Sequence, residues 1–210
     1  MNKIIYQIIK LKVVIMTVKK SEGKREQILR AAEKVFAEKG FQDATISDIV
    51  GRAKVSEATL YEYYSSKEDL LFRIPGDLTS EQKKEIEFVF DHIRGAANKM
   101  RAFIYHNLWF WQTHPDYASV ALVILKQNRK FINTESYRII YDTYQMMLPV
   151  IEEGIESGEF KAGTNPKLVL SMILSIIEYI TVNKILHGTP ENLLEYVDPI
   201  TDQILGGLRA

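Results

Sequence analysis

Apolar side chains recur three and four positions apart along most of this chain, which is the spacing of one face of an α-helix. The pattern predicts helices over residues 24–39, 81–95, 96–113, 117–131 and 135–157. His114-Pro115 and residues 158–166 interrupt it. No alternation with a period of two is long enough to predict a strand. The expected fold class is therefore all-α.

Shorter helices with clear start signals are predicted between residues 45 and 70. Thr45 and Asp48 have the spacing of a capping box. Ser56 and Ser66 are placed to cap the two helices that follow. The helix after Ser56 carries small, hydroxyl and tyrosine side chains, and such a surface can approach base edges in the major groove. The segment therefore predicts a DNA-reading helix-turn-helix.

Residues 167–186 are apolar nearly all round, as in a helix that is buried on more than one side. A membrane span is the rival interpretation, and Glu178 and Asn183 argue against it. Thr189-Pro190 is expected to start a final helix, and the two helices to form a four-helix interface in a twofold dimer. The expected interface residues are Leu170, Leu174, Ile177, Thr181, Leu194, Val197 and Ile204.

Composition narrows the possible chemistry. The 210 residues include no cysteine, which excludes disulfides, thiolate metal sites and cysteine nucleophiles and fits a reducing, cytoplasmic compartment. The formal net charge is zero, so nucleic-acid binding has to come from local geometry and local charge. In residues 1–30, basic side chains outnumber acidic ones by eight to two, as expected of an arm near phosphate.

The chain divides into an N-terminal extension (residues 1–20), a small module (21–75) and a larger helical domain (76–210). The extension is apolar, but Lys10 and Lys12 interrupt the apolar run, which argues against a signal peptide, and the run is too short for a membrane anchor. A helix on a membrane surface is one alternative. The preferred interpretation is a poorly ordered tail, or an upstream extension with Met16 as the true start.

Many positions of the small module match a known family. They are a first helix ending AEKGF, then Thr45, Ile49, Arg52-Ala53, Val55-Ser56, Thr59-Leu60-Tyr61, Tyr63-Tyr64 and Ser66-Lys67-Glu68-Asp69-Leu70. In them the chain resembles the tetracycline-repressor (TetR) family of bacterial regulators. The resemblance implies an N-terminal three-helix DNA-binding module and a C-terminal helical ligand-binding and dimerisation domain. Lys54, Ala58 and Val50 depart from the family pattern, and Lys54 is expected to take a positive φ.

The DNA contacts expected on this basis come from the turn, the second helix and its flanks. Tyr63 and Lys67 are assigned to phosphate, and Tyr61 to sequence reading. The full set is Thr45, Lys54, Ser56, Glu57, Ala58, Thr59, Tyr61, Tyr63 and Lys67.

Family members bind a small molecule between the helices of the larger domain, and that binding lowers their affinity for DNA. An aromatic-rich stretch beside His114-Pro115 suggests such a site, although aromatic side chains at helical spacing are also typical of a core. Glu178 in its apolar helix requires a partner: a tyrosine, a lysine across the dimer or a ligand. The candidate effector-binding residues are Tyr105, His106, Trp109, Gln112, Met146, Tyr179 and Asn183.

The region from residue 125 to the helix after Asn165-Pro166 is similar to family members that sense fatty acyl-coenzyme A. The resulting interpretation is a homodimeric repressor, released from a palindromic double-stranded operator by a small apolar effector, with no cofactor, metal or membrane partner. An enzyme is the rival class, but no glycine-rich phosphate loop, nucleophile elbow or histidine pair at helical spacing is present in the sequence. A helical adaptor that binds a partner through residues 167–186 is the third alternative.

Overall fold

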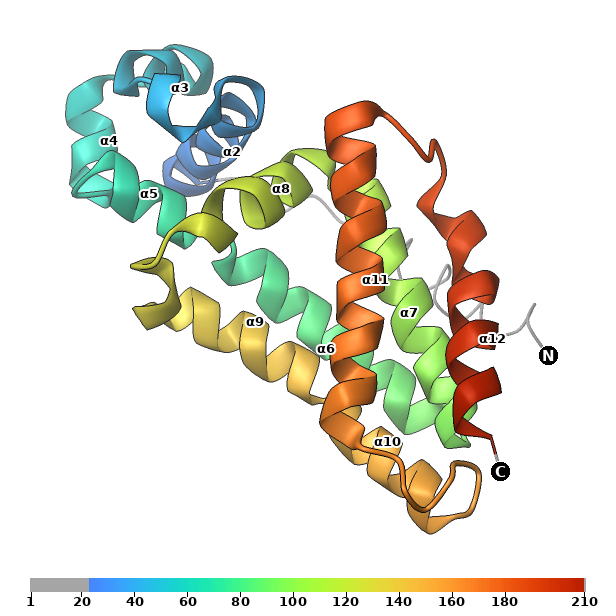
Figure 1. Ribbon diagram of the computed structural model, residues 1–210. Helices are drawn as coiled ribbons and strands as arrows, with labels where there is room; N and C mark the ends of the chain where they lie inside the picture. The colour runs from blue at the N-terminus through green and yellow to red at the C-terminus, as the bar shows by residue number, and fades with distance from the viewer. Residues whose placement is uncertain (1–22, 210) are drawn as a thin grey trace.

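The computed structural model describes residues 23–209, and within them every regular element is a helix or helical turn. Figure 1 shows their arrangement. The all-α prediction is confirmed for this part of the chain, and the N-terminal extension expected over residues 1–20 lies outside the described residues. The helices are α2 (Lys24–Asp43), α3 (Ile46–Ala53), α4 (Glu57–Tyr63), α5 (Lys67–Arg73), α6 (Gly76–His92), α7 (Ala96–Thr113), α8 (Pro115–Ser119), α9 (Glu135–Gln145), α10 (Met147–Glu156), α11 (Pro166–His187) and α12 (Val197–Leu208).

The N-terminal module consists of α2 to α5, which lie together at one end of the molecule (Figure 1). Its centre is formed by fully buried side chains from successive helices, including Ile28, Phe36, Leu60 and Leu70. Gly40 has a φ of 75°, a conformation that glycine adopts without the steric penalty of a Cβ. The resulting kink ends the regular part of α2 and lets the chain turn into α3.

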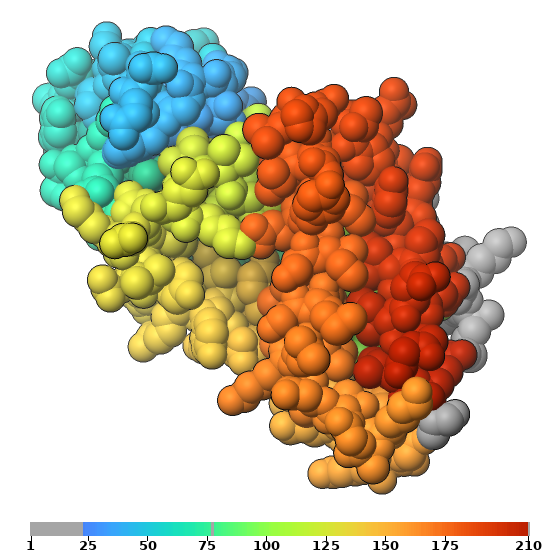
Figure 2. All heavy atoms as spheres, viewed as in Figure 1, coloured from blue at the N-terminus to red at the C-terminus, as the bar shows by residue number. Residues whose placement is uncertain are grey.

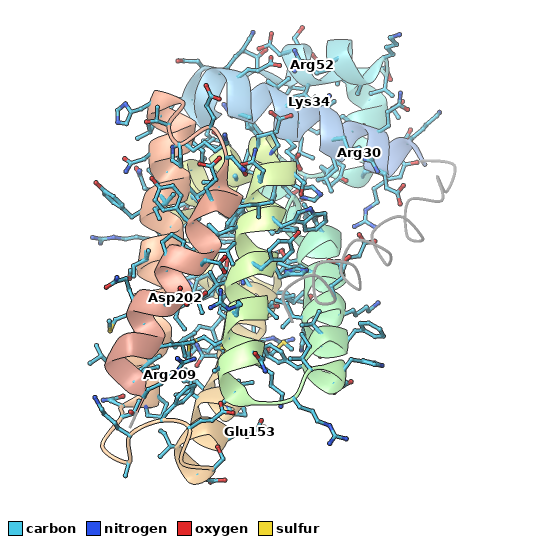
Figure 3. All side chains as sticks on the ribbon, turned by 90° about the vertical axis from the view of Figure 1, so that its right-hand side faces the viewer. Arg30, Lys34, Arg52, Glu153, Asp202 and Arg209 are labelled. Atoms are coloured by element: carbon cyan, nitrogen blue, oxygen red, sulfur yellow. The ribbon has the colours of Figure 1, made fainter. Side chains whose placement is uncertain are left out.

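The larger domain is built around α7, which contacts α6, α10, α11 and α12. Because neighbours surround α7, consecutive positions from Ala102 to Leu108 are all buried. Figure 3 shows α11 and α12 beside one another, with Asp202 on α12 and Arg209 directly after its end. On the α7 side, Arg101 pairs with both Asp198 and Asp202 of α12.

The two parts of the chain meet where α2 packs against α8 and the π-helical turn that follows it, Val120–Ile124. In the space-filling view the N-terminal module forms one lobe and α11 and α12 form a continuous face on the other (Figure 2). The segment after α8 thus belongs to the larger domain but touches the small one.

Several predicted boundaries were wrong. Residues 117–131 are not one helix but α8, the π turn and short 3-10 turns at Leu125–Gln127 and Phe131–Asn133. Thr189-Pro190 does not start the last helix: its peptide bond is cis, a 3-10 turn at Leu193–Tyr196 follows, and α12 starts at Val197. The predicted helix 135–157 is divided at Met146 into α9 and α10.

Candidate DNA-binding surface and internal cavity

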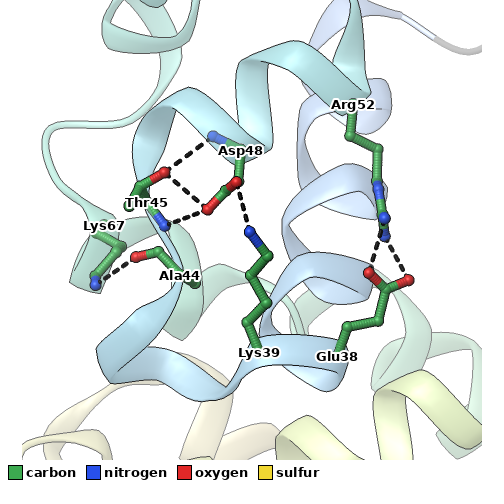
Figure 4. A network of polar contacts seen from close by, with 7 residues as sticks. All are labelled: Glu38, Lys39, Ala44, Thr45, Asp48, Arg52 and Lys67. Carbon is green, nitrogen blue, oxygen red and sulfur yellow. Dashed lines mark hydrogen bonds and ion pairs between the residues drawn. The ribbon is translucent and has the colours of Figure 1, made fainter.

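The N-terminus of α3 is fixed by the predicted capping box. The Thr45 hydroxyl accepts a hydrogen bond from the Asp48 N–H at 3.1 Å, and the Asp48 carboxylate accepts from the Thr45 N–H at 3.0 Å (Figure 4). Lys39 of α2 donates to the same carboxylate at 2.6 Å. The hydrogen bonds from Lys39 and Thr45 lower the pKa of Asp48 to about 2, so the box stays charged at neutral pH.

The turn between α3 and α4 depends on a lysine in the left-handed conformation. Lys54 has φ 51° and ψ 46°, which confirms the positive φ expected from the sequence. The Val55 N–H then bonds to the Val50 carbonyl at 3.1 Å, and Val50 is buried between the two helices. Lys54 itself is exposed, so its charge lies on the outer surface of the turn.

The surface of α4 carries the side chains that sequence reasoning assigned to DNA. Ser56 caps the helix by accepting from the Thr59 N–H at 3.1 Å, and Leu60 anchors the opposite face in the core. Tyr61 is 52% exposed and Tyr63 is 43% exposed. Thr59 is partly buried, and the exposed members of the set in and around the helix-turn-helix are Thr45, Lys54, Ser56, Glu57, Ala58, Tyr61 and Tyr63.

Lys67, which is predicted to contact phosphate, forms hydrogen bonds within the module in this structure. Its Nζ lies 2.7 Å from the carbonyl oxygen of Phe41 and 2.8 Å from that of Ala44, with the Gln42 carbonyl at 3.3 Å. It also lies 4.6 Å from the centre of the Phe41 ring. An ammonium group has three N–H donors, so these carbonyls engage all of them. In the structure Lys67 ties the α2–α3 connection to α5 (Figure 4).

Arg52, another cation of the module, is also engaged within it. Its guanidinium forms a two-pronged pair with Glu38, with both N–O distances at 2.7 Å. Figure 3 shows Arg30 and Lys34 on α2 and Arg52 on α3, on the same lobe. Because Arg52 and Lys39 are paired with carboxylates, the exposed charge at Lys54 is the better-placed cation beside α4.

The larger domain contains a cavity of about 510 Å³ between α6, α7, α9, α11 and the segment after α8. Its lining is mainly apolar and aromatic, as in small-molecule sites. Buried walls include Trp111, Tyr117, Leu125, Phe131 and Ile177, while Ile132 and Tyr141 are exposed at its edge.

None of the predicted effector-binding residues lines this cavity. His106 is buried and pairs through Nε2 with Glu85 at 2.8 Å. The Gln112 side chain accepts a hydrogen bond from the Leu193 N–H at 2.9 Å and so fixes the connection to α12. Tyr179 is 69% exposed. Tyr105 is buried; Trp109, Met146 and Asn183 are partly buried elsewhere.

The predicted residues lie on a different face of α7 from the one that lines the cavity. The helix presents Asn107 and Trp111 to the cavity, whereas Tyr105, Trp109 and Gln112 point to other neighbours. Two amides, at Gln82 on α6 and Asn107 on α7, occupy buried positions where an apolar side chain is usual. A buried amide in an otherwise apolar stretch was the signal that sequence reasoning missed.

Glu178 of α11 pairs with Lys126, so the partner that it required lies within the same chain. Both side chains line the cavity. Lys126 belongs to a basic segment with Arg129 and Lys130, all exposed, and Lys130 pairs with Glu68 of α5 at 3.0 Å. The basic segment therefore adjoins the cavity through Lys126, and two of its three cations are in ion pairs with carboxylates.

Most of the predicted dimer residues face the interior of the chain rather than its surface. Leu170, Ile177, Thr181, Val197 and Ile204 are buried in the core, while Leu174 and Leu194 are partly buried. The opposite face of α11 is the exposed one. Its apolar side chains are Leu168, Met172, Tyr179 and Leu186, with Met172 at 46% and Leu168 at 59% exposure.

Within residues 23–209, α11 is the helix whose length and composition would allow it to cross a membrane. Its most apolar window has a mean hydropathy of 1.6, and 28% of that window is buried. The same composition suits a helix that packs on its own core with one face and on a second chain with the other. A single helix of this kind is weak evidence for a membrane span.

A helix-turn-helix with a short polar second helix, attached to a helical domain with an internal cavity, defines a DNA-binding regulator. Comparison with known protein families identifies the family of regulators to which the chain belongs. Residues 28–74 match the model of the bacterial regulatory proteins of the tetR family, and residues 77–207 match that of the YsiA-like protein C-terminal region. The chain belongs to the TetR family of transcriptional regulators. It is therefore a regulator and not an enzyme.

Individual relatives are consistent with this assignment. The chain is 23% identical over 190 residues to the fatty acid metabolism regulator protein of Bacillus subtilis, covering 90% of this chain and 98% of that one. It is 26% identical over 165 residues to the transcriptional repressor NicS of Pseudomonas putida, covering 76% of each chain. The crystal structure of the transcriptional regulator FadR from B. subtilis in complex with stearoyl-CoA superposes with a TM-score of 0.76 at 25% identity, covering 87% and 98% of the two chains.

Proposed function

We propose that this chain is a homodimeric repressor that loses affinity for a palindromic operator when an effector fills the cavity between α6, α7, α9 and α11. One observation supports it above all: Phe131 lines the cavity and also packs on Phe72 of the DNA-binding module, with ring centroids 5.7 Å apart. A ligand that moves Phe131 therefore acts directly on α5. Coupling requires only that the ligand bind one arrangement of the two parts more tightly than the other.

The segment after α8 offers a second connection. Ala121 and Leu122 of the π-helical turn line the cavity, and the turn contacts α2. π-helical turns in otherwise α-helical segments are often found at functional sites. Occupancy of the cavity thus affects contacts to both α2 and α5, the helices on either side of the helix-turn-helix.

The effector class that we propose is a fatty acyl thioester of coenzyme A. A mainly apolar cavity suits an acyl chain. Lys126 lines the same cavity, and Arg129 and Lys130 follow it on an exposed segment. These cations suit the phosphates of coenzyme A, which would replace Glu178 and Glu68 as partners of Lys126 and Lys130. FadR of B. subtilis, which resembles this chain along most of its length, has been crystallised with stearoyl-CoA.

The dimer that we propose uses the exposed face of α11 and the adjoining face of α12. Gly206 and Gly207 on α12 leave open space where a Cβ would project, so a second backbone can approach closely. Two copies joined there present two α4 helices, one to each half-site of the palindromic operator. Contacting both half-sites at once increases the affinity and specificity of a chain whose formal net charge is zero. Repression of this kind takes place in the cytoplasm.

The experiment is a fluorescence anisotropy titration of labelled DNA from upstream of the chain's own gene, at two salt concentrations, with and without stearoyl-CoA. We expect specific binding that weakens as salt rises and a loss of affinity of about tenfold or more when the thioester is present. Coenzyme A alone is the control for its charge. An operator affinity that stays the same with every acyl-CoA tested would contradict the proposed effector class but not the DNA-binding role.

A further inference from the structure

Two side-chain amides in the cavity wall have buried atoms without a hydrogen-bond partner. They are Oδ1 of Asn107 and Nε2 of Gln82, and the two residues are 0% and 4% exposed. Most buried polar atoms in folded proteins are paired with protein or ordered water, so each unpaired one requires an explanation. Two of them in the wall of one cavity indicate that the cavity's occupant supplies the partners.

The orientation of the Asn107 amide is fixed by its other end. Asn107 Nδ2 donates to the Phe103 carbonyl at 2.8 Å, and a carbonyl only accepts. Exchanging the amide oxygen and nitrogen would place two acceptors against each other. Asn107 Oδ1 is therefore an acceptor that needs a donor, while Gln82 presents an unpaired N–H.

Nearby contacts, through Tyr117, link the turns of α6 and α7 that carry the two amides. Thr79 lies one helical turn before Gln82 on α6, and its hydroxyl is 3.0 Å from the hydroxyl of Tyr117. Trp111, one turn after Asn107 on α7, stacks on Tyr117 with ring centroids 5.7 Å apart. We call Thr79, Gln82, Asn107 and Tyr117 the polar inner wall.

The polar inner wall differs from the cavity's exposed edge. Its members are all at least nine-tenths buried, whereas Tyr141 at the edge is 51% exposed and Lys126 is exposed. Burial raises the pKa of the Tyr117 phenol, which therefore stays protonated. All groups of the inner wall are then neutral, in contrast to the charged pair of Lys126 and Glu178 at the edge.

We propose that the polar inner wall is a recognition subsite for a neutral hydroxyl on the buried part of the effector. A hydroxyl donates one hydrogen bond, to Asn107 Oδ1, and accepts one, from Gln82 Nε2. A terminal methyl group does neither, and a ketone or carboxylate has no hydrogen to give Asn107. On the effector class proposed above, on which this inference rests, the preferred ligand is a hydroxyacyl rather than a plain saturated acyl thioester.

The test compares two probes that differ only at the end of the acyl chain, dodecanoyl-CoA and 12-hydroxydodecanoyl-CoA. The corresponding pair with 10 carbons is included because the distance from the cavity edge to the polar inner wall sets the acyl length at which the hydroxyl meets the amides. Isothermal titration of the full chain gives each dissociation constant. We expect the hydroxylated member of at least one pair to bind about tenfold or more tightly, the size of one or two net hydrogen bonds. Equal affinity within both pairs overturns the subsite and leaves the acyl-CoA proposal standing; no binding by any probe overturns both.

Variants of the inner wall give an independent measurement. Gln82→Leu and Asn107→Leu remove the unpaired atoms, so each should abolish the preference for the hydroxylated probe and raise the melting temperature of the ligand-free chain. Gln145→Leu replaces a partly buried amide that does not line the cavity and serves as the matched control. A lower melting temperature in both wall variants, with the preference unchanged, means that ordered water already satisfies the amides and overturns the inference.

Discussion

The ring of Phe131 packs against the ring of Phe72, with their centroids 5.7 Å apart and their planes inclined by 41°. Phe131 is buried in the cavity wall, and Phe72 belongs to α5, which follows α4, the second helix of the helix-turn-helix. Lys130, next to Phe131, pairs with Glu68 on the same α5. The cavity and the DNA-binding module therefore share a direct contact, and no long chain of intermediates is needed to connect them.

We expect Phe131→Ala to uncouple the two sites. The variant loses the ring through which we propose that occupancy of the cavity reaches α5, so the effector should lower operator affinity much less than in the wild type. Couplings of this kind are typically about 1–3 kcal/mol, or roughly five- to 150-fold in affinity, and we expect most of that factor to disappear. Operator dissociation constants with and without acyl-CoA measure it.

Tyr137→Ala is the matched control for that experiment. Tyr137 also lines the cavity and contacts the Phe131 ring, at 5.9 Å between centroids, but it belongs to α9 of the larger domain. It should weaken effector binding and retain coupling. If both variants lose coupling equally, the effect comes from damage to the cavity and not from the contact between Phe131 and Phe72.

Lys67→Met is expected to destabilise the module rather than to weaken phosphate binding. The substitution keeps an unbranched apolar stem but removes the donor shared by the Phe41 and Ala44 carbonyls. Removing a hydrogen bond to a charged group typically costs about 1.5–3 kcal/mol, and partial exposure of Lys67 places the loss near or below the lower value. The melting temperature should fall by a few degrees, as calorimetry would show.

Lys54→Gln is the contrasting substitution, because Lys54 is exposed on the turn beside α4. It should leave the melting temperature unchanged and flatten the slope of log affinity against log salt by about one. If Lys67→Met instead flattens the slope and Lys54→Gln does not, the phosphate contact belongs to Lys67, as the sequence first suggested.

Tyr61→Ala should remove sequence discrimination without loosening the fold. Tyr61 lies exposed on α4, whereas Leu60 beside it is buried and holds the helix in place. A good contact to a base edge is worth about 1–3 kcal/mol, so the preference for operator over unrelated DNA should fall by roughly ten- to 100-fold. Binding to unrelated DNA, measured in the same buffer, should not change, and an unaltered preference would remove Tyr61 from the reading surface.

Met172→Glu combined with Tyr179→Glu should convert the dimer to a monomer. Both side chains lie on the exposed face of α11, and two copies packed there would bury the added carboxylates without partners. Sedimentation equilibrium gives the mass, and operator affinity should fall with it. Tyr141→Glu adds a charge at an exposed tyrosine of α9 and should remain dimeric. A double variant that stays dimeric would place the interface elsewhere.

Features that depend on near neighbours were predicted well from the sequence. The capping box of Thr45 and Asp48, the cap at Ser56 and the positive φ of Lys54 are all present in the structure, because each depends on residues within a few positions. Asn165 caps α11 and Pro166 is its first residue, which is likewise a local arrangement. Local chemistry fixes where these helices begin and end.

The direction in which a helix faces could not be predicted where the helix is apolar on every side. On α7 and α11 the hydrophobic pattern has no polar face to mark solvent, so it cannot separate a wall of the cavity from the core or the core from an exposed surface. Asn107 was overlooked and Leu170 was placed on the wrong face for this reason. The carbonyl partners of Lys67 could not be predicted because they lie more than twenty residues away in the chain.

A pH dependence of stability is expected from Glu33, which lies on α2 near Asp116 of α8, where the two domains meet. Burial, with the nearby Asp116 carboxylate, raises the pKa of Glu33 to about 7, although Arg30 and Lys34 oppose the shift. Between the ordinary glutamate pKa and about 7, the folded chain holds a proton that the unfolded chain has released, so stability falls as pH rises through this window. Glu33→Gln should remove this slope and be more stable than the wild type above pH 7 but not at pH 4.

Urea denaturation at several pH values measures the difference, with Glu26→Gln on the exposed face of α2 as the control. Parallel curves for the wild type and Glu33→Gln between pH 5 and pH 8 would mean that Glu33 is already ionised at the domain junction.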